Sequence, residues 1–375
     1  MSQPLELPRW MDLVLLPAFN LALALLVAGA VVAAVGMDPL QVVGWLVKGA
    51  FGSRSAVSYT LYYATTFVFT GLAVAVAFHG GLFNIGGEGQ AMLGGLGAAL
   101  LALTWGAQGP AWLMLPLMVL ASMLFGMAWA AVPAALQAWR GSHVVITTIM
   151  FNFIASALLG WLLVEPMRAA GSMQPETRGF AAGALMPRFD DVMAWLGTKT
   201  SGSPLNASFA LALIAALASH VFIARTRAGY AVRVLGANPR AALYAGISPT
   251  RTIVVAMLIS GALASGLALN EITGAQGRLI LEFTGGYGFV GIAVALMGRN
   301  HPFGVVLAAL LFGCRVWREG GRPADIAFAA LIYLSPLFNP PVMFAAGLAT
   351  PLLIAAFIVL VLRRGLARVS AVPGP

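Results

Sequence analysis

The chain contains few charged residues, a single cysteine and only two lysines, and each shortage excludes a class of protein. Charged residues make up 9% of its 375 residues, against roughly a quarter in ordinary soluble domains. No polar shell can therefore cover a water-soluble globule of this size. Cys314 alone cannot form an intramolecular disulfide, and the four scattered histidines show no metal-ligand spacing. We expect neither a disulfide nor a metal or other cofactor bound by this chain.

The two lysines, Lys48 and Lys199, do not lie in a phosphate-binding motif. A P-loop needs Gly-x-x-x-x-Gly-Lys-Ser/Thr, whose backbone N–H groups and lysine hold the phosphates. The glycine cluster Gly80–Gly89 is not a dinucleotide fingerprint either, because no strand precedes it. A membrane enzyme would need paired ionisable groups, and only Glu88 lies deep in an apolar run. We therefore expect no ATPase site and no enzyme activity in the chain itself.

Long apolar runs dominate what is present. Hydrophobic residues make up 60% of the chain, and about 20 apolar residues span a bilayer as a helix. We predict an all-α, polytopic membrane protein with about nine or ten crossings, some of them broken or re-entrant. The first run shows no cleavage site and is expected to be a retained helix without a signal peptide. The runs lie at residues 13–35, 56–78, 91–105, 111–138, 144–164, 207–224, 252–269, 285–297, 303–316, 326–338 and 342–362.

Arginine placement predicts the orientation. Residues 225–251 hold five arginines and no acidic residue, so the positive-inside rule makes this segment cytoplasmic. Counting back one helix places residues 165–206 outside the membrane. The net charge of +9 fits loops at an anionic lipid surface better than a nucleic-acid surface.

The segment Gly80–Gln90 places Asn84, Glu88 and Gln90 within sequence that is otherwise apolar enough for a bilayer. Polar groups at this depth are costly unless they face the bundle interior, water or a partner. With five glycines beside them, they indicate a break between helices that lines a substrate path. For Glu88 an equally good alternative is structural, with the carboxylate capping the N-terminus of its own helix.

A second candidate set lies on the run at 144–164. Asn152 follows Thr148 by four residues and shares its helical face. A threonine in a membrane helix usually bonds its own backbone, so Asn152 is the path candidate of the two. The nearby aromatic residues stack on a flat substrate or simply pack, and packing is the commoner role. These residues are Phe83, Phe151, Tyr287 and Phe289.

A third polar cluster follows the run at 252–269. It comprises Asn270, Glu271, Gln276, Arg278 and Glu282. We expect an ordinary solvated loop with an i, i+4 pair between Arg278 and Glu282. The alternative is a docking surface for a substrate-carrying protein.

The arginine-rich segment also has the pattern of a small folded element. Asn238-Pro239 is a helix start with proline at the first helical position, and Gly246 is a stop signal. A plain membrane anchor would need the arginines but not this capped helix. We therefore predict that residues 225–251 form a docking knob, which we call the coupling loop.

Four ordered segments together resemble the permease subunits of ABC importers in the branched-chain amino acid and ribose permease superfamily. The Asn-Ile-Gly-Gly-Glu-Gly-Gln sequence at 84–90 looks like the nucleoside and simple-sugar branch of that family. The likeness covers roughly residues 50–312, and residues 314–375 depart from it, forming an atypical C-terminal part. The segments are 84–90, 141–152, 225–251 and 286–302.

This resemblance implies a single transmembrane permease domain over residues 1–375, in a bacterial plasma membrane, that imports nucleosides or simple sugars. It also implies three protein partners besides membrane lipid: a cytosolic ABC ATPase, a second and different permease chain, and an extracytoplasmic substrate-binding lipoprotein. No nucleic acid is involved. In the family the coupling loop docks on the ATPase, and its matching residues here are Arg233, Gly236, Asn238, Pro239, Ala241, Ala242 and Gly246.

A secondary active transporter of a small polar solute remains the alternative. Such proteins more often show matching broken segments in two halves and an intramembrane Asp or His for ion coupling. No convincing repeat of the break at 84–90 occurs in this sequence.

Overall fold

The regular secondary structure of the computed structural model is helical, as the sequence predicts. The structure describes residues 8, 11, 15–34, 36, 38–195, 202 and 204–314, and within these ranges extended pairing is limited to two isolated bridges. The chain divides into two compact units. One comprises Met1–Ser53 with Arg315–Pro375, and the other comprises Arg54–Cys314.

The described part of the first unit consists of two helices, α1 (Leu16–Ala34) and α2 (Pro39–Phe51). Asp38 caps α2 by accepting a hydrogen bond from the Leu40 N–H, and Pro39 occupies the first helical position. The end of α1 and the whole of α2 are bent by 116° relative to each other. The pair therefore has the form of a broken span or a re-entrant loop.

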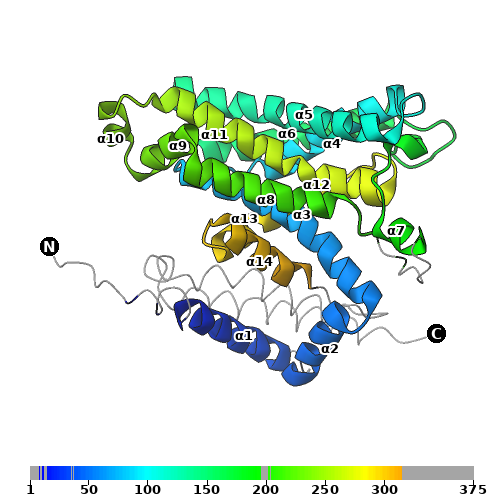
Figure 1. The fold of residues 1–375 in the computed structure, drawn as a ribbon, viewed down its shortest axis with the longest axis horizontal. Coiled ribbons are helices and arrows are strands. Elements are labelled where there is room, and N and C mark those ends of the chain that lie inside the picture. Colours follow the sequence, from blue (N-terminus) through cyan, green and yellow to red (C-terminus); the bar gives the residue numbers. More distant parts are fainter. Residues whose placement is uncertain are drawn as a thin grey trace, which may run out of the picture. The chain divides into compact units, whose positions relative to one another are not determined.

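The second unit contains the remaining helices, and Figure 1 shows how they are arranged. Its long helices are joined by short helical segments, and glycines lie in several of the connections. The elements are α3 (Arg54–His79), α4 (Gly87–Thr104), α5 (Ala111–Arg140), α6 (Val144–Val164), η2 (Ala182–Ala184), α7 (Phe189–Trp195), α8 (Ser208–Arg225), α9 (Arg227–Ala237), α10 (Pro239–Tyr244), α11 (Pro249–Ala264), α12 (Gly266–Ala268), η3 (Leu269–Gln276), α13 (Tyr287–Met297) and α14 (Pro302–Gly313).

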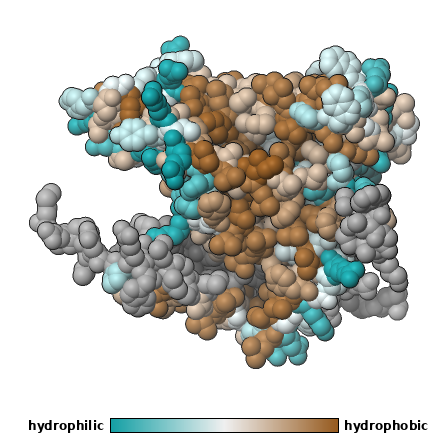
Figure 2. Space-filling view, viewed as in Figure 1, coloured by the Kyte–Doolittle hydropathy of each residue, from teal (hydrophilic) through white to brown (hydrophobic). Residues whose placement is uncertain are grey.

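Helix α3 lies at the centre of this unit, and α5, α6 and α8 lie at its periphery. In the most apolar window of α3, 83% of the residues are buried, against 22% in α5 and 28% in both α6 and α8. Figure 2 shows hydrophobic side chains over the middle of the unit and hydrophilic ones gathered toward its ends. Peripheral helices with exposed apolar side chains fit a lipid environment, where no aqueous interface forces those side chains inward.

The prediction of nine or ten crossings is not reproduced. Within the described residues, five helices are long and apolar enough to cross a membrane, or six if the bent α1–α2 pair counts as one span. The runs at 285–297 and 303–316 form α13 and α14, which have 11 and 12 residues. At 1.5 Å per residue each reaches only about half of a 30 Å hydrocarbon core. The runs at 326–338 and 342–362, and most of the atypical C-terminal part, lie outside the described residues.

The solvated loop predicted after residue 269 is wrong for its first two members. The helix continues from α11 through α12 into η3, a π-helical segment on which Asn270 and Glu271 are buried. The Tyr62 hydroxyl donates to Glu271 Oε2 over 2.5 Å, and Asn270 Nδ2 donates to Thr66 Oγ1 over 2.8 Å. Partners on α3, about 200 positions away, explain why these polar side chains end a membrane helix rather than begin a loop.

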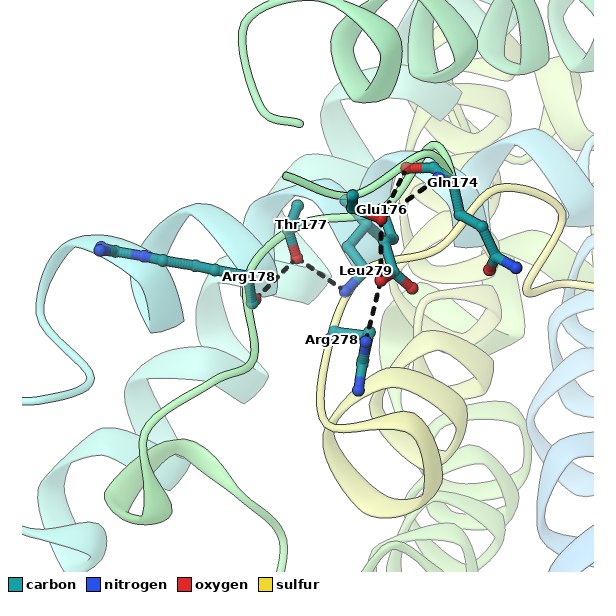
Figure 3. A network of polar contacts seen from close by, with 7 residues as sticks. Gln174, Glu176, Thr177, Arg178, Arg278 and Leu279 are labelled. Atoms are coloured by element: carbon teal, nitrogen blue, oxygen red, sulfur yellow. Dashed lines mark hydrogen bonds and ion pairs between the residues drawn. The ribbon is translucent and has the colours of Figure 1, made fainter. Parts of the chain in front are cut away.

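The predicted pair between Arg278 and Glu282 is also wrong. Gly277 has φ +66° and ends the helix, so the four-residue spacing no longer places the two side chains on one face. Arg278 instead forms an ion pair with Glu176, with 2.9 Å between Nη1 and Oε1. Figure 3 shows this pair beside the hydrogen bond from the Leu279 N–H to the Thr177 hydroxyl. The connection from α6 to α8 is thereby fastened to the chain that leads into α13.

The two long connections flanking α8 lie at opposite ends of the helical unit. The segment with α9 and α10 extends from one end in Figure 1, and α7 lies at the other. This arrangement matches the separation that the arginine distribution predicts for residues 225–251 and 165–206.

Candidate functional site

The break between α3 and α4 is organised around the side chain of Asn84. Asn84 is 1% exposed and accepts a hydrogen bond from the Gly86 N–H over 2.8 Å. Its amide donates to the Ser260 hydroxyl over 2.8 Å and exchanges hydrogen bonds of 3.1 and 3.2 Å with the Gln90 amide. The Ser260 hydroxyl donates in turn to the Ala73 carbonyl. Backbone groups freed by the break are thus satisfied by side chains, as a non-helical stretch at membrane depth requires.

Helix α6 holds the same break from the other side through Asn152. Asn152 Oδ1 accepts from the Gly89 N–H over 2.9 Å, and its Nδ2 donates to the Ile85 carbonyl over 2.9 Å. The Thr148 hydroxyl accepts from the Ile85 N–H and donates to the Val144 carbonyl of its own helix. Both groups of the Asn152 amide are therefore engaged with the backbone of the break.

Glu88 lies in the first turn of its own helix, α4, and its side chain bonds the start of a second helix. Its carboxylate accepts hydrogen bonds from the backbone N–H groups of Gly286 and Gly288, over 2.9 and 2.7 Å. These residues begin α13, so the carboxylate lies at the partial positive charge of that helix's N-terminus. A Cβ on Gly288 would lie 2.5 Å from the Glu88 nitrogen. The N-termini of α4 and α13 therefore meet, with one carboxylate between them.

A cavity of about 290 Å³ opens beside this junction. It lies between α4, α6 and the chain that leads into α13, and its surface is mainly apolar. Of the predicted path residues, Glu88, Asn152 and Phe289 line it. The other lining residues are Met92, Ile149, Phe153, Ser156, Glu282, Thr284, Gly285 and Gly286.

The other three predicted aromatic residues do not line the cavity. Phe83 packs edge-on against Phe78, and Phe151 packs against Trp129, with ring centroids 6.0 and 5.3 Å apart. Tyr287 packs edge-on against Phe67 with centroids 5.6 Å apart. Their positions fit packing, which is the commoner of the two roles expected for them from the sequence.

Sequence reasoning missed two polar residues of this region, Ser260 and Thr284, and it assigned Glu282 to a solvated loop rather than to the cavity. Nothing in the sequence marks Ser260, because its partners lie on other helices. The Gly285-Gly286 pair directly after Thr284 was the available signal, since it announces a turn before a half-length helix.

The capped helix predicted within the coupling loop is present. Asn238 accepts hydrogen bonds from the Arg240 and Ala241 N–H groups over 2.9 and 3.2 Å, and Pro239 begins α10. Gly246 follows the helix with φ +72°. The preceding helix, α9, is capped by Thr226, whose hydroxyl accepts from the Gly229 N–H.

The α10 helix presents an exposed surface and one buried contact. Tyr244 is 95% exposed and Leu243 is 60% exposed, whereas Ala242 is fully buried. Of the other predicted coupling residues, Arg233 is half-buried, and Gly236, Asn238, Pro239, Ala241 and Gly246 are exposed.

Helix α9 contacts the chain just before the break through Gly236. A Cβ on Gly236 would collide with the His79 carbonyl and would lie 2.8 Å from the Gly81 nitrogen. The adjacent Gly80 is less confined, since a Cβ there would lie 3.4 Å from the Val232 side chain of α9, at ordinary contact distance. The glycine at position 236 thus lets the coupling loop touch the backbone that leads to Asn84.

Comparison with known proteins identifies the family of the chain. Residues 56–315 match the model of the branched-chain amino acid transport system / permease component family. A glucose ABC transporter permease protein of Haloferax volcanii is 34% identical over 84% of this chain and 83% of its own length. A nucleoside ABC transporter permease protein of Lactococcus lactis is 33% identical over 85% of this chain and 90% of its own. A guanosine ABC transporter permease protein of Bacillus subtilis is 34% identical over 87% of this chain and 91% of its own.

A second ABC transporter permease from each of these organisms also matches, at 24%, 28% and 29% identity respectively. The family match covers more than half of the chain and includes the break, the cavity and the coupling loop. The chain is a multi-pass membrane protein that belongs to the branched-chain amino acid transport system / permease component family.

Proposed function

We propose that this chain is the transmembrane subunit of an ATP-driven importer of nucleosides or simple sugars. The observation that carries the proposal is 33–34% identity to glucose, nucleoside and guanosine permeases over at least 84% of the chain. The chain contributes no P-loop of its own, so ATP is hydrolysed by a separate cytosolic subunit. Two of these relatives come from bacteria, which supports a bacterial plasma membrane as the location.

We propose further that the substrate path runs beside the junction of α4 and α13. Interrupted helices whose N-termini lie inside a membrane protein commonly form its substrate site. Asn84, Gln90 and Asn152 act there mainly as a framework, because their amides already bond the backbone and one another. Glu88, Asn152 and Phe289 also face the cavity and supply part of its lining.

The coupling loop is proposed to transmit the movement of the ATPase to this framework. Its outer surface, formed by Leu243 and Tyr244, is exposed and apolar enough to dock in a groove of a partner. Its inner surface contacts Gly80 and Gly81 directly through Gly236. A displacement of α10 therefore reaches the break within a few residues.

The proposed complex contains a second, different permease chain and an extracytoplasmic substrate-binding lipoprotein besides the ATPase. In three organisms two distinct permeases resemble this chain, one at 33–34% identity and the other at 24–29%. This pattern supports a pair of different chains. The substrate-binding lipoprotein is placed on the face that carries residues 165–206.

Reconstitution tests the proposal against secondary transport. The chain is co-purified with the ATPase and permease encoded beside its gene, placed in liposomes, and supplied with the binding protein. We expect uptake of labelled uridine or glucose that requires internal ATP and continues when ionophores collapse ion gradients. Uptake that continues without ATP, or stops with the ionophore, would overturn it.

A further inference from the structure

The cavity beside α13 contains a buried hydroxyl that the surrounding protein leaves without a partner. Thr284 is 1% exposed, and its Oγ1 makes no hydrogen bond to any residue that the structure describes. Thr284 is also a lining residue of the cavity. Buried polar groups are almost always paired, so this one indicates an occupant that supplies the partner. Water meets that need when the cavity holds no solute, and a polar ligand meets it otherwise.

An exposed carboxylate without an internal partner lines the same cavity. Among the described residues none forms a hydrogen bond or ion pair with the Glu282 side chain, whereas the Glu88 carboxylate nearby is occupied by two backbone N–H groups. Glu282 also has φ +56°, in the left-handed region that disfavours a side chain. Strain of this kind persists where the surroundings impose it, and it gathers at binding sites.

Aromatic side chains provide the remaining wall. Phe153 and Phe289 line the cavity and are 66% and 46% exposed. An apolar surface with a few hydrogen-bonding groups is the usual composition of a small-molecule site, and 290 Å³ lies at the small end of such sites. A single ring with a C–H face and a hydroxylated edge fits this combination, since a carboxylate accepts hydrogen bonds from neighbouring hydroxyls.

We propose that this cavity binds the hydroxylated ring of the transported solute, the sugar itself or the ribose of a nucleoside. The Glu282 carboxylate accepts hydrogen bonds from ring hydroxyls, the Thr284 hydroxyl pairs with one of them, and Phe153 and Phe289 cover the ring face. This inference rests on the proposed function and adds the chemical group that the permease itself recognises.

Protection of a cysteine in the cavity tests occupancy directly. Ser156, a lining residue, is changed to Cys in a Cys314→Ser background, and the reconstituted complex is alkylated with a small thiol reagent. The probes are uridine and D-glucose, and import is measured on the same vesicles. The control is Ser172→Cys, at a half-buried position away from the cavity, in the connection between α6 and α8. We expect the imported probe to slow alkylation of Ser156→Cys at least about fivefold, and Ser172→Cys to be unaffected.

The outcomes separate the two proposals. Import of a probe without protection of Ser156→Cys overturns the cavity site and leaves the importer function standing. Import of neither probe overturns the proposed function and the cavity assignment with it. Equal protection of both cysteines also overturns the site, because it shows a general effect on reactivity.

Two substitutions test which side-chain groups of the cavity bind the solute. Thr284→Val removes the hydroxyl, and its control Thr273→Val removes an equally buried hydroxyl that bonds its own helix at the Leu269 carbonyl. Glu282→Gln removes the charge, with the exposed Glu165→Gln as its control. We expect the half-protecting uridine concentration to rise about three- to tenfold for Thr284→Val and at least about tenfold for Glu282→Gln.

The analogue 2′,3′-dideoxyuridine completes this test. It lacks the ribose hydroxyls that the site is proposed to bind, so its weaker protection should be the same in the wild type and both variants. If the substitutions weaken protection by uridine and protection by its dideoxy analogue equally, the cavity does not bind the ring hydroxyls and the inference fails. When glucose is the imported probe, 2-deoxyglucose takes the place of the analogue.

Discussion

The junction of α4 with α13 and the coupling loop both contain glycine and polar residues but use them in opposite ways. At the junction, Asn84, Glu88 and Asn152 are buried. Glu88 and Asn152 bond backbone groups of other segments, and Asn84 bonds the Ser260 hydroxyl on α11. In the coupling loop, Asn238 caps its own helix start, and the Thr226 hydroxyl bonds the start of α9 and the adjoining end of α8, while the outer surface stays exposed. The junction is thus held by tertiary contacts, whereas the coupling loop is held mainly by local caps.

This difference predicts which substitutions lower stability together with transport and which affect only an interaction with another protein. A substitution in the junction removes a partner from a buried backbone group and so lowers stability together with transport. A substitution on the outer surface of α10 removes only a contact available to another protein. The following changes are ordered by their expected effect on stability.

Gly288→Val should have the largest effect because it drives the two helix N-termini apart. A Cβ at this position would lie 2.5 Å from the Glu88 nitrogen and 2.6 Å from its Oε2. We expect the free energy of unfolding to fall by about 3 kcal/mol or more, measured by thermal unfolding of the detergent-solubilised complex. Gly160→Ala is the control, since its nearest neighbour would be 3.9 Å away. Wild-type stability of Gly288→Val would show that the two helices are not packed this closely.

Asn152→Leu should lower stability by about 2–3 kcal/mol, because it leaves the Gly89 N–H and the Ile85 carbonyl without their partner. Thr147→Val on the same helix is the control, since the Thr147 hydroxyl bonds only its own backbone. Uptake of labelled uridine or glucose is measured beside thermal stability. A loss of uptake greater than the loss of stability supports a part in the substrate path, and a proportional loss assigns Asn152 a structural part alone.

Gly236→Ala tests a close contact between the two regions. The added Cβ collides with the His79 carbonyl, so we expect a loss of about 1–3 kcal/mol and a reduced coupling of ATP hydrolysis to transport. Gly179→Ala is the control, because nothing lies within 4 Å of the position its Cβ would take. If a Gly236→Ala complex hydrolyses ATP at the normal rate and still couples hydrolysis tightly to transport, this contact does not transmit the movement of the ATPase.

Leu243→Glu should change stability by less than about 0.5 kcal/mol, since the side chain is exposed. The same change should abolish substrate-stimulated ATP hydrolysis in the reconstituted complex, because a charge enters the proposed docking surface. Ala241→Glu, also exposed, should behave alike, whereas Ala242→Glu should destabilise the protein because Ala242 is fully buried. Full ATPase stimulation in Leu243→Glu would place the docking surface elsewhere.

Cysteine labelling tests the orientation without changing stability. Met173 is 100% exposed in the connection between α6 and α8, and Tyr244 is 95% exposed on α10. In a Cys314→Ser background, Met173→Cys should react with a membrane-impermeant thiol reagent in intact cells, and Tyr244→Cys should react only after lysis. The reverse pattern would invert the topology.

The local parts of the fold were predictable from the sequence. The cap of α10 depends on Asn238, Pro239 and Gly246, which lie within nine positions of one another, so short-range chemistry determines it. The break after α3 was marked by glycines beside polar residues for the same reason. The number of crossings is not confirmed, because apolar composition does not distinguish a full span from the half-length helices α13 and α14 and the last two predicted runs lie outside the described residues.

The sequence by itself determined the all-α membrane class, the position of the break and the form of the coupling loop. Only the tertiary structure decided that Glu88 caps a helix 200 positions away, that Asn152 bonds the break across 63 positions, and that Arg278 pairs with Glu176 instead of Glu282. Apolar run length, glycine and helix caps act over a few residues along the chain. The partner of a buried polar group is chosen by which helices pack together, and that choice depends on the whole bundle at once.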